Sequence, residues 1–483
     1  MSHPALLVSA AHKSSGKTTI TLALAAALAA RGHAVQPFKK GPDYIDPMWL
    51  TLAAGRPCIN LDPQLMGWDE ITQVFAQRMR GADIGLVEGN KGLHDGLALD
   101  GSNSNAALAA HLGLPVLLVL DTRGMTRGIA PLILGYQAFD PSIRIAGVIL
   151  NHVGGPRHEG KLRAVIEHYT DVPVLGAVPK DARLALAERH LGLMPDHELG
   201  DAPERVRAMG ELIAGCVDLD RVRALAASRR HEDVAAPIAD ATLRAASAPL
   251  RIGIARDKAF GFYYPDDLEA LAAEGAELVP FDTLADRALP PALDGLFIGG
   301  GFPELFMAEL EANVSLRSAL QRAIAAGLPT YAECGGLMYL ARSITWKDQR
   351  AQMVGAIPGD VLMHARPVGR GYVRVEETGE FPWQDEASEP MLRLGHEFHH
   401  SNLQNLDPEV QFAYRVQRGH GIDGLHDGVM VNNLLASYTH LRHTGGNDWP
   451  RRFIAFVRRV REDAAGAADT APLRVGGSTW STR

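Results

Sequence analysis

The sequence contains little cysteine and no long apolar run. Three of its 483 residues are cysteine, Cys58, Cys216 and Cys334, and they lie far apart in the chain. An odd number of widely separated cysteines argues against a disulfide framework and favours a reducing compartment, so we expect a cytoplasmic protein. No stretch approaches the roughly 20 apolar residues that a membrane-spanning helix needs. The N-terminus also lacks a charged region followed by an apolar run, so we expect neither a signal peptide nor a membrane partner.

An excess of positive charge is also missing. Lysine and arginine number 48 against 56 aspartates and glutamates, which gives a formal net charge of −8. This balance argues against nucleic acid or an anionic membrane as a partner. An apolar content of 46% with 22% charged residues fits a globular protein. Because 483 residues exceed one ordinary core, we expect two or three domains.

Short β-branched runs alternate with helical stretches in the first half. Residues 19–31 are rich in alanine and are predicted to form a helix that Gly32 ends. Each apolar run is short and ends at a polar residue, glycine or proline, which is typical of buried strands. Strands separated by helices predict a parallel α/β sheet. The expected strands are residues 6–9, 35–38, 84–87, 116–120, 145–150 and 174–178.

A change of composition near the middle of the chain marks a linker. Residues 229–249 are rich in alanine, proline and charge and lack a strand pattern. Alternation of strands and helices restarts after them. Strands are expected at residues 251–255, 277–281, 295–298 and 329–332. We therefore expect an α/β domain at residues 1–228, a linker at 229–249, a second α/β domain at 250–462 and a flexible tail at 463–483.

The segment AHKSSGKT, residues 11–18, follows an expected strand and opens the alanine-rich helix. Backbone N–H groups at a helix start face an anion, so a phosphate-binding loop is expected here. Lys17 can reach the β- and γ-phosphates of ATP, and the Thr18 hydroxyl can bind Mg²⁺. Ala11 replaces the usual first glycine, and the alternative is a chance Gly-Lys-Thr at a helix start. The residues of this loop that we expect to contact ATP are Ser14, Ser15, Gly16, Lys17 and Thr18.

Carboxylates that could join Thr18 in binding Mg²⁺ follow two neighbouring strands. Glu88 comes directly after residues 84–87, and Asp46 lies in PFKKGPDYIDP, which ends the strand at 35–38. Ligands of a parallel sheet lie beyond the carboxyl ends of its strands, so these groups are expected at one edge. The alternatives are a solvated strand end for Glu88 and a Pro/Asp turn for the second segment.

Polar residues beside these carboxylates are candidates for binding an acidic substrate. Residues 89–96, GNKGLHDG, are dense in glycine, which lets a backbone approach a ligand closely. Asn151 ends a later strand and could frame an adenine. The substrate-binding candidates are Lys39, Lys40, Asp43, Tyr44, Asn90, Lys91, His94 and Asp95.

In the second half, Cys334 stands between an expected strand and a helix and is followed by two glycines. A nucleophile on a sharp strand-to-helix turn needs small neighbours because the turn is strained. A helix start and a basic neighbour favour the thiolate, and His440 is the candidate base. The residue two after His440 is Arg442, so no acidic residue that orients the histidine is evident. The alternative is a buried structural cysteine. The competing histidines are His396, His399 and His400.

A glycine turn follows the strand expected at residues 295–298. Two backbone N–H donors must stabilise the oxyanion that forms when a thiolate attacks an amide. We assign this role to Gly300 and Gly301 in FIGGGFPE. A plain glycine loop is the alternative.

These motifs together resemble the cobyrinate (or hydrogenobyrinate) a,c-diamide synthases along the whole chain except its tail. The resemblance implies a dethiobiotin-synthetase-like ATPase domain and a class I glutaminase domain in which Cys334 is the nucleophile and His440 assists it. It also implies that acetate side chains of a tetrapyrrole become acetamides with ATP, Mg²⁺ and glutamine, and that no acid after His440 is needed. The matching segments are SSGKTT, FKKGPDYIDP, GRPCINLDP, VEGNKGLHDG, RHEG, ERHLGL, GGGFPELF, AECGGLMYL, GHEFHHS and ASYTHL.

Two stretches widen the choice of acceptor. EGNKGLHDGLALDGSNSNAALA is longer and more polar than the corrinoid enzymes' segment, and GMTRGIAPLILGYQAFD resembles a sub-branch similar to glutamine-dependent sirohaem amidases. Sirohaem is therefore the alternative acceptor. A different class, a partitioning-type ATPase switch, usually has a second lysine where His12 stands and carries no glutaminase. We also consider a homodimer.

Overall fold

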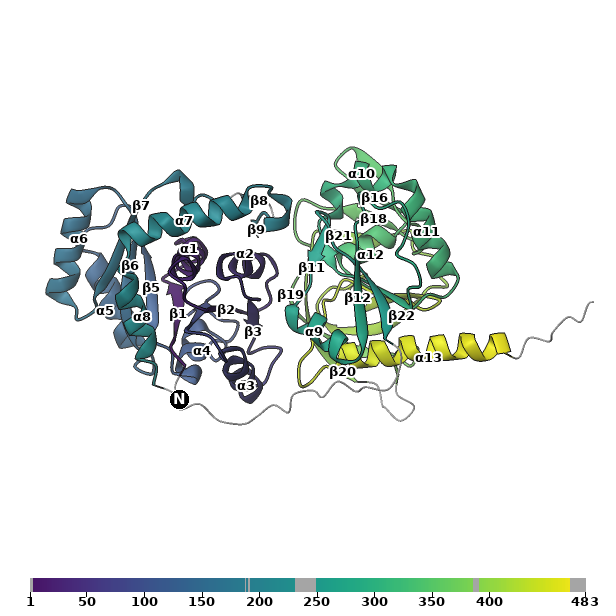
Figure 1. Ribbon diagram of the computed structural model, residues 1–483, viewed down its shortest axis with the longest axis horizontal. Coiled ribbons are helices and arrows are strands. Elements are labelled where there is room, and N and C mark those ends of the chain that lie inside the picture. Colours follow the sequence, from purple (N-terminus) through teal and green to yellow (C-terminus); the bar gives the residue numbers. More distant parts are fainter. Residues whose placement is uncertain (1–2, 187, 190–191, 231–248, 385–390, 470–483) are drawn as a thin grey trace, which may run out of the picture. The chain divides into compact units, whose positions relative to one another are not determined.

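The computed structural model describes residues 3–186, 188–189, 192–230, 249–384 and 391–469. The chain divides into two compact units (Figure 1). The first comprises Met1–Thr242, Phe262–Asp267 and Arg442–Asn447, and the second comprises Leu243–Gly261, Leu268–Leu441 and Asp448–Arg483.

The first unit is built on a parallel sheet of seven strands in the order β3-β2-β4-β1-β5-β6-β7. All six strands expected from the sequence are present, and the parallel α/β fold is confirmed. No apolar run signalled the seventh strand, β3, because it has only three residues. The strands are β1 Ala5–Ala10, β2 Val35–Lys40, β3 Ile59–Leu61, β4 Ile84–Glu88, β5 Val116–Asp121, β6 Ile145–Val153 and β7 Val174–Pro179, with a small hairpin of β8 Glu188–Arg189 and β9 Gly192–Leu193.

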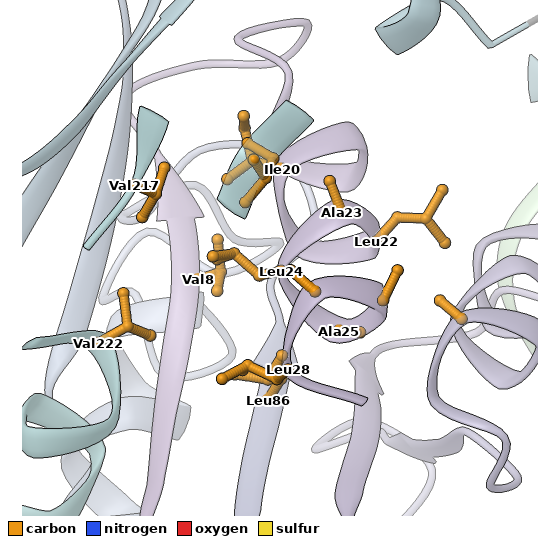
Figure 2. Packing of buried hydrophobic residues seen from close by; sticks show 14 of the residues in the cluster. Val8, Ile20, Leu22, Ala23, Leu24, Ala25, Leu28, Leu86, Val217 and Val222 are labelled. Atoms are coloured by element: carbon orange, nitrogen blue, oxygen red, sulfur yellow. The ribbon is translucent and has the colours of Figure 1, made fainter. Parts of the chain in front are cut away.

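Helices cover both faces of this sheet because alternate side chains of its buried strands enter two separate cores. Leu6 and Val8 pack with α1, α7 and α8, whereas Leu7 packs on the opposite face with α3 to α6. In Figure 2, Val8 and Leu86 of the sheet lie against the α1 residues Leu24 and Leu28. The helices are α1 Lys17–Ala30, α2 Ile45–Ala54, α3 Trp68–Arg78, α4 Asn105–Leu112, α5 Ile129–Phe139, α6 Pro156–Tyr169, α7 Ala202–Cys216 and α8 Leu219–Ala227, with 3-10 turns at Ala182–Leu184 and Asp196–Glu198.

The second unit contains a mixed sheet of nine strands in the order β12-β10-β13-β15-β24-β23-β22-β19-β20. The four strands expected from the sequence form its parallel part with β24, and the remaining four strands pair antiparallel. The sequence patterns did not indicate this antiparallel part. The large-sheet strands are β10 Leu250–Ala255, β12 Ala276–Phe281, β13 Gly295–Ile298, β15 Thr330–Glu333, β19 Gly369–Glu377, β20 Leu392–His399, β22 Gln411–Arg418, β23 His426–Val431 and β24 Leu434–Ser437.

Two smaller sheets and the helices after the expected linker complete this half of the chain. The order in the four-stranded sheet is β17-β16-β18-β21, and β11 pairs with β14. These strands are β11 Phe260–Phe262, β14 Gly300–Gly301, β16 Ser343–Trp346, β17 Gln349–Gln352, β18 Asp360–Met363 and β21 Ser401–Gln404. The helices are α9 Pro265–Ala273, α10 Met307–Ala312, α11 Val314–Ala325, α12 Gly335–Leu340 and α13 Trp449–Asp469, with a 3-10 turn at Pro303–Leu305.

The last strand of the large sheet returns to the segment that follows β24. An isolated antiparallel bridge joins His396 of β20 to His440. The His396 N–H donates to the His440 carbonyl at 3.2 Å, and the His440 N–H donates to the His396 carbonyl at 2.8 Å. The antiparallel strands therefore hold the loop that carries the candidate catalytic histidine.

The structure also bears on the ends of the expected domains. Arg229 packs in the first unit, where its Nε donates to the Leu112 carbonyl at 2.8 Å and its guanidinium lies 4.7 Å from the Phe75 ring centroid. Residues 231–248 of the expected linker and 470–483 of the expected tail lie outside the described residues. The helix α13 runs to Asp469, beyond the boundary expected at residue 463, because alanine-rich sequence favours helix.

Two further observations concern the cysteines and the helices. All three cysteines carry free thiols. Within the ranges given above, no helix combines the length and the apolar character that a membrane span requires.

Candidate active site

The loop between β1 and α1 has a strained backbone that suits an anion cradle. Ser14 and Gly16 have positive φ angles of 64° and 87°. A Cβ atom on Gly16 would lie 2.2 Å from Asn151 Nδ2. That nitrogen donates a hydrogen bond to the Ser15 carbonyl at 2.9 Å. Asn151 therefore braces the loop from β6, and glycine is the residue that fits beneath it. The expected contact of Asn151 with adenine stays a prediction.

The structure brings Thr18, Lys39, Asp46 and Glu88 together at the carboxyl end of the parallel sheet. Thr18 Oγ1 donates to Glu88 Oε1 at 2.5 Å and to Asp46 Oδ2 at 3.3 Å. Lys39 Nζ donates to Glu88 Oε1 at 2.9 Å and also to Asp46 Oδ2. Asp43 Oδ2 lies 4.0 Å from the same nitrogen. The cluster arises because β1, β2 and β4 are neighbours, so the residues at their ends meet.

Burial and neighbouring charges set the protonation of this cluster. Burial raises the pKa of Glu88, although Lys39 opposes the rise. Burial and then the Asp46 charge raise the pKa of Asp43 to about 7. Burial lowers the pKa of Lys17, and the charge on Lys39 adds to this effect. For Lys39, burial alone would lower the pKa, but Asp46 and Glu88 outweigh it and the pKa rises. Lys39 is therefore held as an ammonium among three carboxylates.

The same cluster fits a magnesium ion that is bound together with nucleotide phosphates. Glu88 Oε2 is buried and has no hydrogen-bond partner among the described residues, so an acceptor remains for a ligand. Mg²⁺ prefers oxygen ligands and usually takes one or two protein carboxylates beside water and phosphate. In the described ranges, no three or more His, Cys, Asp and Glu side chains form a metal-binding group of their own. The oxygens of Thr18, Asp46 and Glu88 would therefore supply only some of the ligands of the ion.

Asn105, which no sequence pattern indicated, fixes the glycine-rich loop after β4. Its Nδ2 donates to the carbonyls of Asn90 and Gly92 at 2.5 and 2.8 Å, and its Oδ1 accepts the Asn90 N–H at 3.1 Å. Lys40 Nζ lies 3.4 Å from Asn90 Oδ1, and burial lowers the pKa of Lys40 to about 8. Asn105 thus anchors the loop beside a lysine whose pKa lies well below that of an exposed lysine.

The other substrate-binding candidates are divided between this loop and an aromatic cluster. Lys91 is exposed and has a positive φ of 43°. The His94 ring packs on Tyr136 and Phe139, with centroids 5.1 and 4.9 Å away. Asp95 Oδ2 accepts the Gly92 N–H at 3.0 Å. Within the first unit, the Tyr44 ring stacks on Phe262 with centroids 5.4 Å apart, so Tyr44 is engaged in aromatic packing.

In the second unit, Cys334 occupies the strained turn that the sequence predicted. Its φ is 47° and its ψ is −99°, at the start of α12. A Cβ atom on Gly335 would lie 2.8 Å from Gly301 N, and one on Gly336 would lie 2.1 Å from the Ile298 carbonyl oxygen. The two glycines therefore allow the turn to approach the backbone of β13 and β14. This approach also brings the Gly300–Gly301 strand, our candidate oxyanion hole, beside the turn that carries Cys334.

His440 lies next to Cys334 because the strands that precede them are neighbours. β15 pairs in parallel with β24, and the Cys334 N–H donates to the Ser437 carbonyl at 2.7 Å. Burial alone would lower the pKa of His440, but side-chain hydrogen bonds with Cys334 and Glu333 outweigh burial and raise the pKa to about 10. An imidazolium beside a sulfur stabilises the thiolate form.

Glu333 is the acidic partner that the sequence did not reveal. Its Oε2 lies 3.2 Å from His440 Nδ1, and its Oε1 accepts the Leu441 N–H at 2.9 Å and the Tyr331 hydroxyl at 2.6 Å. The carboxylate stands directly before Cys334 in the chain, whereas Arg442 occupies the position two residues after His440. In the first unit, Arg442 donates to Asp266 Oδ2 at 2.8 Å. A cysteine, a histidine and a glutamate thus form one buried hydrogen-bonded set.

The competing histidines take other positions. His396 stacks on His440 with ring centroids 4.9 Å apart. His399 stacks on Tyr438 at 3.9 Å, and His400 Nδ1 lies 3.3 Å from the His364 carbonyl. His440 shares a side-chain hydrogen bond with Cys334, so it remains our candidate for the imidazole partner of the thiol.

Comparison with known proteins agrees with both halves of this description. Residues 7–193 match the CobQ/CobB/MinD/ParA nucleotide binding domain, and residues 251–448 match the CobB/CobQ-like glutamine amidotransferase domain. A cobyrinate a,c-diamide synthase of Magnetococcus marinus is 47% identical over 458 residues, covering 94% of this chain and 97% of the relative.

Relatives from other organisms carry the same name. The cobyrinate a,c-diamide synthase of Methanosarcina acetivorans is 44% identical and covers 91% of this chain and 92% of its own length. That of Dehalococcoides mccartyi strain 195 is 39% identical and covers 94% of this chain and 98% of its own length. The chain therefore belongs to the cobyrinate a,c-diamide synthase family of glutamine-dependent ligases.

Proposed function

We propose that this protein converts the a and c acetate side chains of cobyrinate into acetamides, with ATP to activate each carboxylate and glutamine to supply the nitrogen. The observation that carries the proposal is the buried set of Cys334, His440 and Glu333, in a chain that also has a strained loop before α1 with Lys17 and Thr18 at the helix start. One half can release ammonia, and the other can make an acid reactive.

In the glutaminase half, Cys334 attacks the amide carbon of glutamine as a thiolate. His440 gives its proton to the departing ammonia, and Glu333 keeps the imidazole oriented and stabilises its positive charge. The backbone N–H groups at Gly300 and Gly301 are proposed to stabilise the oxyanion, which is supported by the closeness of Gly301 to Gly335. Water then cleaves the thioester, and the imidazole accepts a proton from that water.

In the synthetase half, the loop of residues 14–18 and the Lys17 ammonium are proposed to bind the phosphates of ATP. Magnesium held by Thr18, Asp46 and Glu88 would neutralise phosphate charge and orient the γ-phosphate. The Lys39 ammonium donates to Glu88 and Asp46 and so holds these two carboxyl groups in place. Lys40, Asn90, Lys91, His94 and Asp95 are proposed to bind the tetrapyrrole near the transferred phosphate.

Phosphorylation is needed because a carboxylate is a poor electrophile and hydroxide is a poor leaving group. The acyl phosphate provides a good leaving group, and ammonia replaces it. Ammonia that escaped to water would be protonated and lose its lone pair, so we propose that it stays within the protein. A cytoplasmic location, suggested by the free cysteines, and a homodimer belong to the same proposal.

The relatives' names favour cobyrinate over sirohaem as the acceptor. A partitioning-type ATPase is disfavoured because residues 251–448 match a glutamine amidotransferase domain. The test is to incubate the protein with ATP, Mg²⁺ and glutamine and to offer cobyrinate, hydrogenobyrinate and sirohaem separately. Mass spectrometry should detect amides of cobyrinate, whereas amidation of sirohaem alone would overturn the assignment.

A further inference from the structure

A second buried carboxylate, Asp427 of β23, contacts the turn that carries His440 but has no role in the chemistry described so far. Its Oδ1 accepts the N–H groups of Gly428 and Tyr438 at 2.8 and 3.0 Å, and its Oδ2 accepts the Thr439 N–H at 2.9 Å. The side chain is fully buried, with 0% of its surface exposed. A carboxylate in such a place is held by the donors around it.

The turn, residues 438–441, lies beyond the continuous strand pairing of the sheet. The pairing of β23 with β24 spans Val429–Val431 and Leu434–Ala436. Beyond it, Asp427 binds the N–H groups of Tyr438 and Thr439, His396 binds that of His440 through its carbonyl, and Glu333 binds that of Leu441. Four consecutive backbone donors thus have defined acceptors, and three of the acceptors are carboxylate oxygens.

This arrangement fixes the backbone immediately before and after His440. Glu333 acts on the imidazole directly, through Nδ1 at 3.2 Å. Asp427 acts through the backbone instead, because it holds the N–H groups of Tyr438 and Thr439, the two residues that precede His440. A shift of about 1 Å in a catalytic group can cost on the order of 100-fold in rate. The backbone clamp therefore bears on how well the imidazole meets the sulfur of Cys334.

We propose that Asp427 is a positioning residue for glutamine cleavage, because its carboxylate fixes the backbone of Tyr438 and Thr439 and so keeps His440 in place beside Cys334. Asp427 has this role only if His440 and Cys334 cleave glutamine as proposed above. Both carboxylate oxygens are needed, since Oδ1 and Oδ2 accept from different residues.

The variant Asp427→Asn tests this role because it keeps the size of the side chain but replaces one acceptor by an NH₂ donor. The NH₂ group would then face the backbone N–H of Tyr438 or of Thr439. Two donors would meet in a buried place, and neither would have an acceptor there. We expect kcat for glutamine hydrolysis to fall roughly 10- to 100-fold while KM for glutamine changes by less than about threefold. Amidation driven by free ammonium should stay at the wild-type rate.

Glu377→Gln is the matched control for a general loss of stability. Glu377 is a buried carboxylate of the same sheet, and its partners, Arg393 and Arg452, lie outside residues 438–441. Both variants are assayed below their melting temperatures, and the rate at which chloroacetamide alkylates Cys334 is measured as a second readout. We expect Asp427→Asn alone to lose glutamine hydrolysis and fast alkylation.

Equal kcat and alkylation rates in the two variants would overturn the role of Asp427. If Asp427→Asn does not fold, Asp427→Glu serves instead: it retains both oxygens but displaces them by one methylene, so kcat should again fall at constant KM. If Asp427→Glu hydrolyses glutamine with the wild-type kcat while its ammonium-driven amidation is also at the wild-type rate, the proposed role of Asp427 is refuted. A wild-type protein that never hydrolyses glutamine would instead refute the proposed function, and the role of Asp427 with it.

Discussion

Replacing Glu333 by glutamine removes the negative charge beside His440 Nδ1 while it keeps the shape of the side chain. The amide oxygen can still accept the Leu441 N–H and the Tyr331 hydroxyl, which lie 2.9 and 2.6 Å from Oε1. The NH₂ group then faces the imidazole, where Oε2 lies at 3.2 Å in the wild type. We therefore expect the variant to fold. Its chief defect should be the loss of the hydrogen bond between the carboxylate and the protonated His440 ring.

The size of the effect follows from the lost charged hydrogen bond. Such a bond contributes about 1.5–3 kcal/mol, and one pKa unit corresponds to about 1.36 kcal/mol. The pKa of His440, raised to about 10 by its partners, should thus fall by roughly one to two units in Glu333→Gln. If the same energy stabilises the transition state, kcat for glutamine hydrolysis should fall roughly 10- to 100-fold.

The pH dependence of stability has a definite sign. The folded-state pKa of His440 lies above its ordinary value, so its contribution to stability is fully present below about pH 6.5 and is lost as the pH rises towards about 10. In Glu333→Gln the folded-state pKa is lower, so the variant should show a smaller loss of melting temperature over this range.

The assay measures glutamate release at saturating glutamine across the pH range, together with thermal melts of both proteins. The alkaline limb of the kcat profile should move to lower pH in the variant, and ammonium-driven amidation should be unaffected. Wild-type kcat with an unmoved alkaline limb would show that Glu333 neither orients nor charges His440, and the account of this site would be wrong.

Three further outcomes are expected. Cys334→Ala should abolish the use of glutamine but retain amidation with free ammonium, and loss of both would mean that the two reactions are not separable. Gly336→Ala should lower the melting temperature by an amount equivalent to about 1–3 kcal/mol, because its Cβ would lie 2.1 Å from the Ile298 oxygen. Gly379→Ala, whose Cβ would meet none of the described residues within 4 Å, is the control and should melt like the wild type. Glu88→Gln should weaken the Mg²⁺ dependence of ATP use without changing glutamine hydrolysis, and an unaltered Mg²⁺ titration would remove Glu88 from the metal site.

The parallel part of the fold could be predicted because its strands are apolar on both faces. Runs such as Leu6–Val8 and Leu117–Val119 enter cores on both sides of the sheet, and short buried runs between helices are a strong local signal. The antiparallel strands β19, β20 and β22 could not be predicted because they mix charged and apolar residues, as in GRGYVRVEE of β19. Their place depends on long-range pairing, which no local pattern records.

The candidate sites divide in the same way. Cys334, Lys17 and Thr18 were evident because a strained turn and a phosphate loop need glycine at fixed neighbouring positions. Glu333 and Asp427 were not evident, since Glu333 of β15 meets His440, and Asp427 of β23 meets Tyr438 and Thr439, only after the strands have paired. Asn105 likewise contacts the loop after β4 from the start of α4.

The most direct test of the central claim follows nitrogen from glutamine into the tetrapyrrole. The protein is incubated with cobyrinate, ATP, Mg²⁺ and glutamine labelled with ¹⁵N in its side-chain amide, and the product is analysed by mass spectrometry beside a reaction with unlabelled ammonium in excess. The account predicts that both new amides carry the label, that their formation consumes ATP, and that Cys334→Ala incorporates only unlabelled nitrogen. Labelled amides formed by Cys334→Ala, or no amide formed by the wild type, would contradict it.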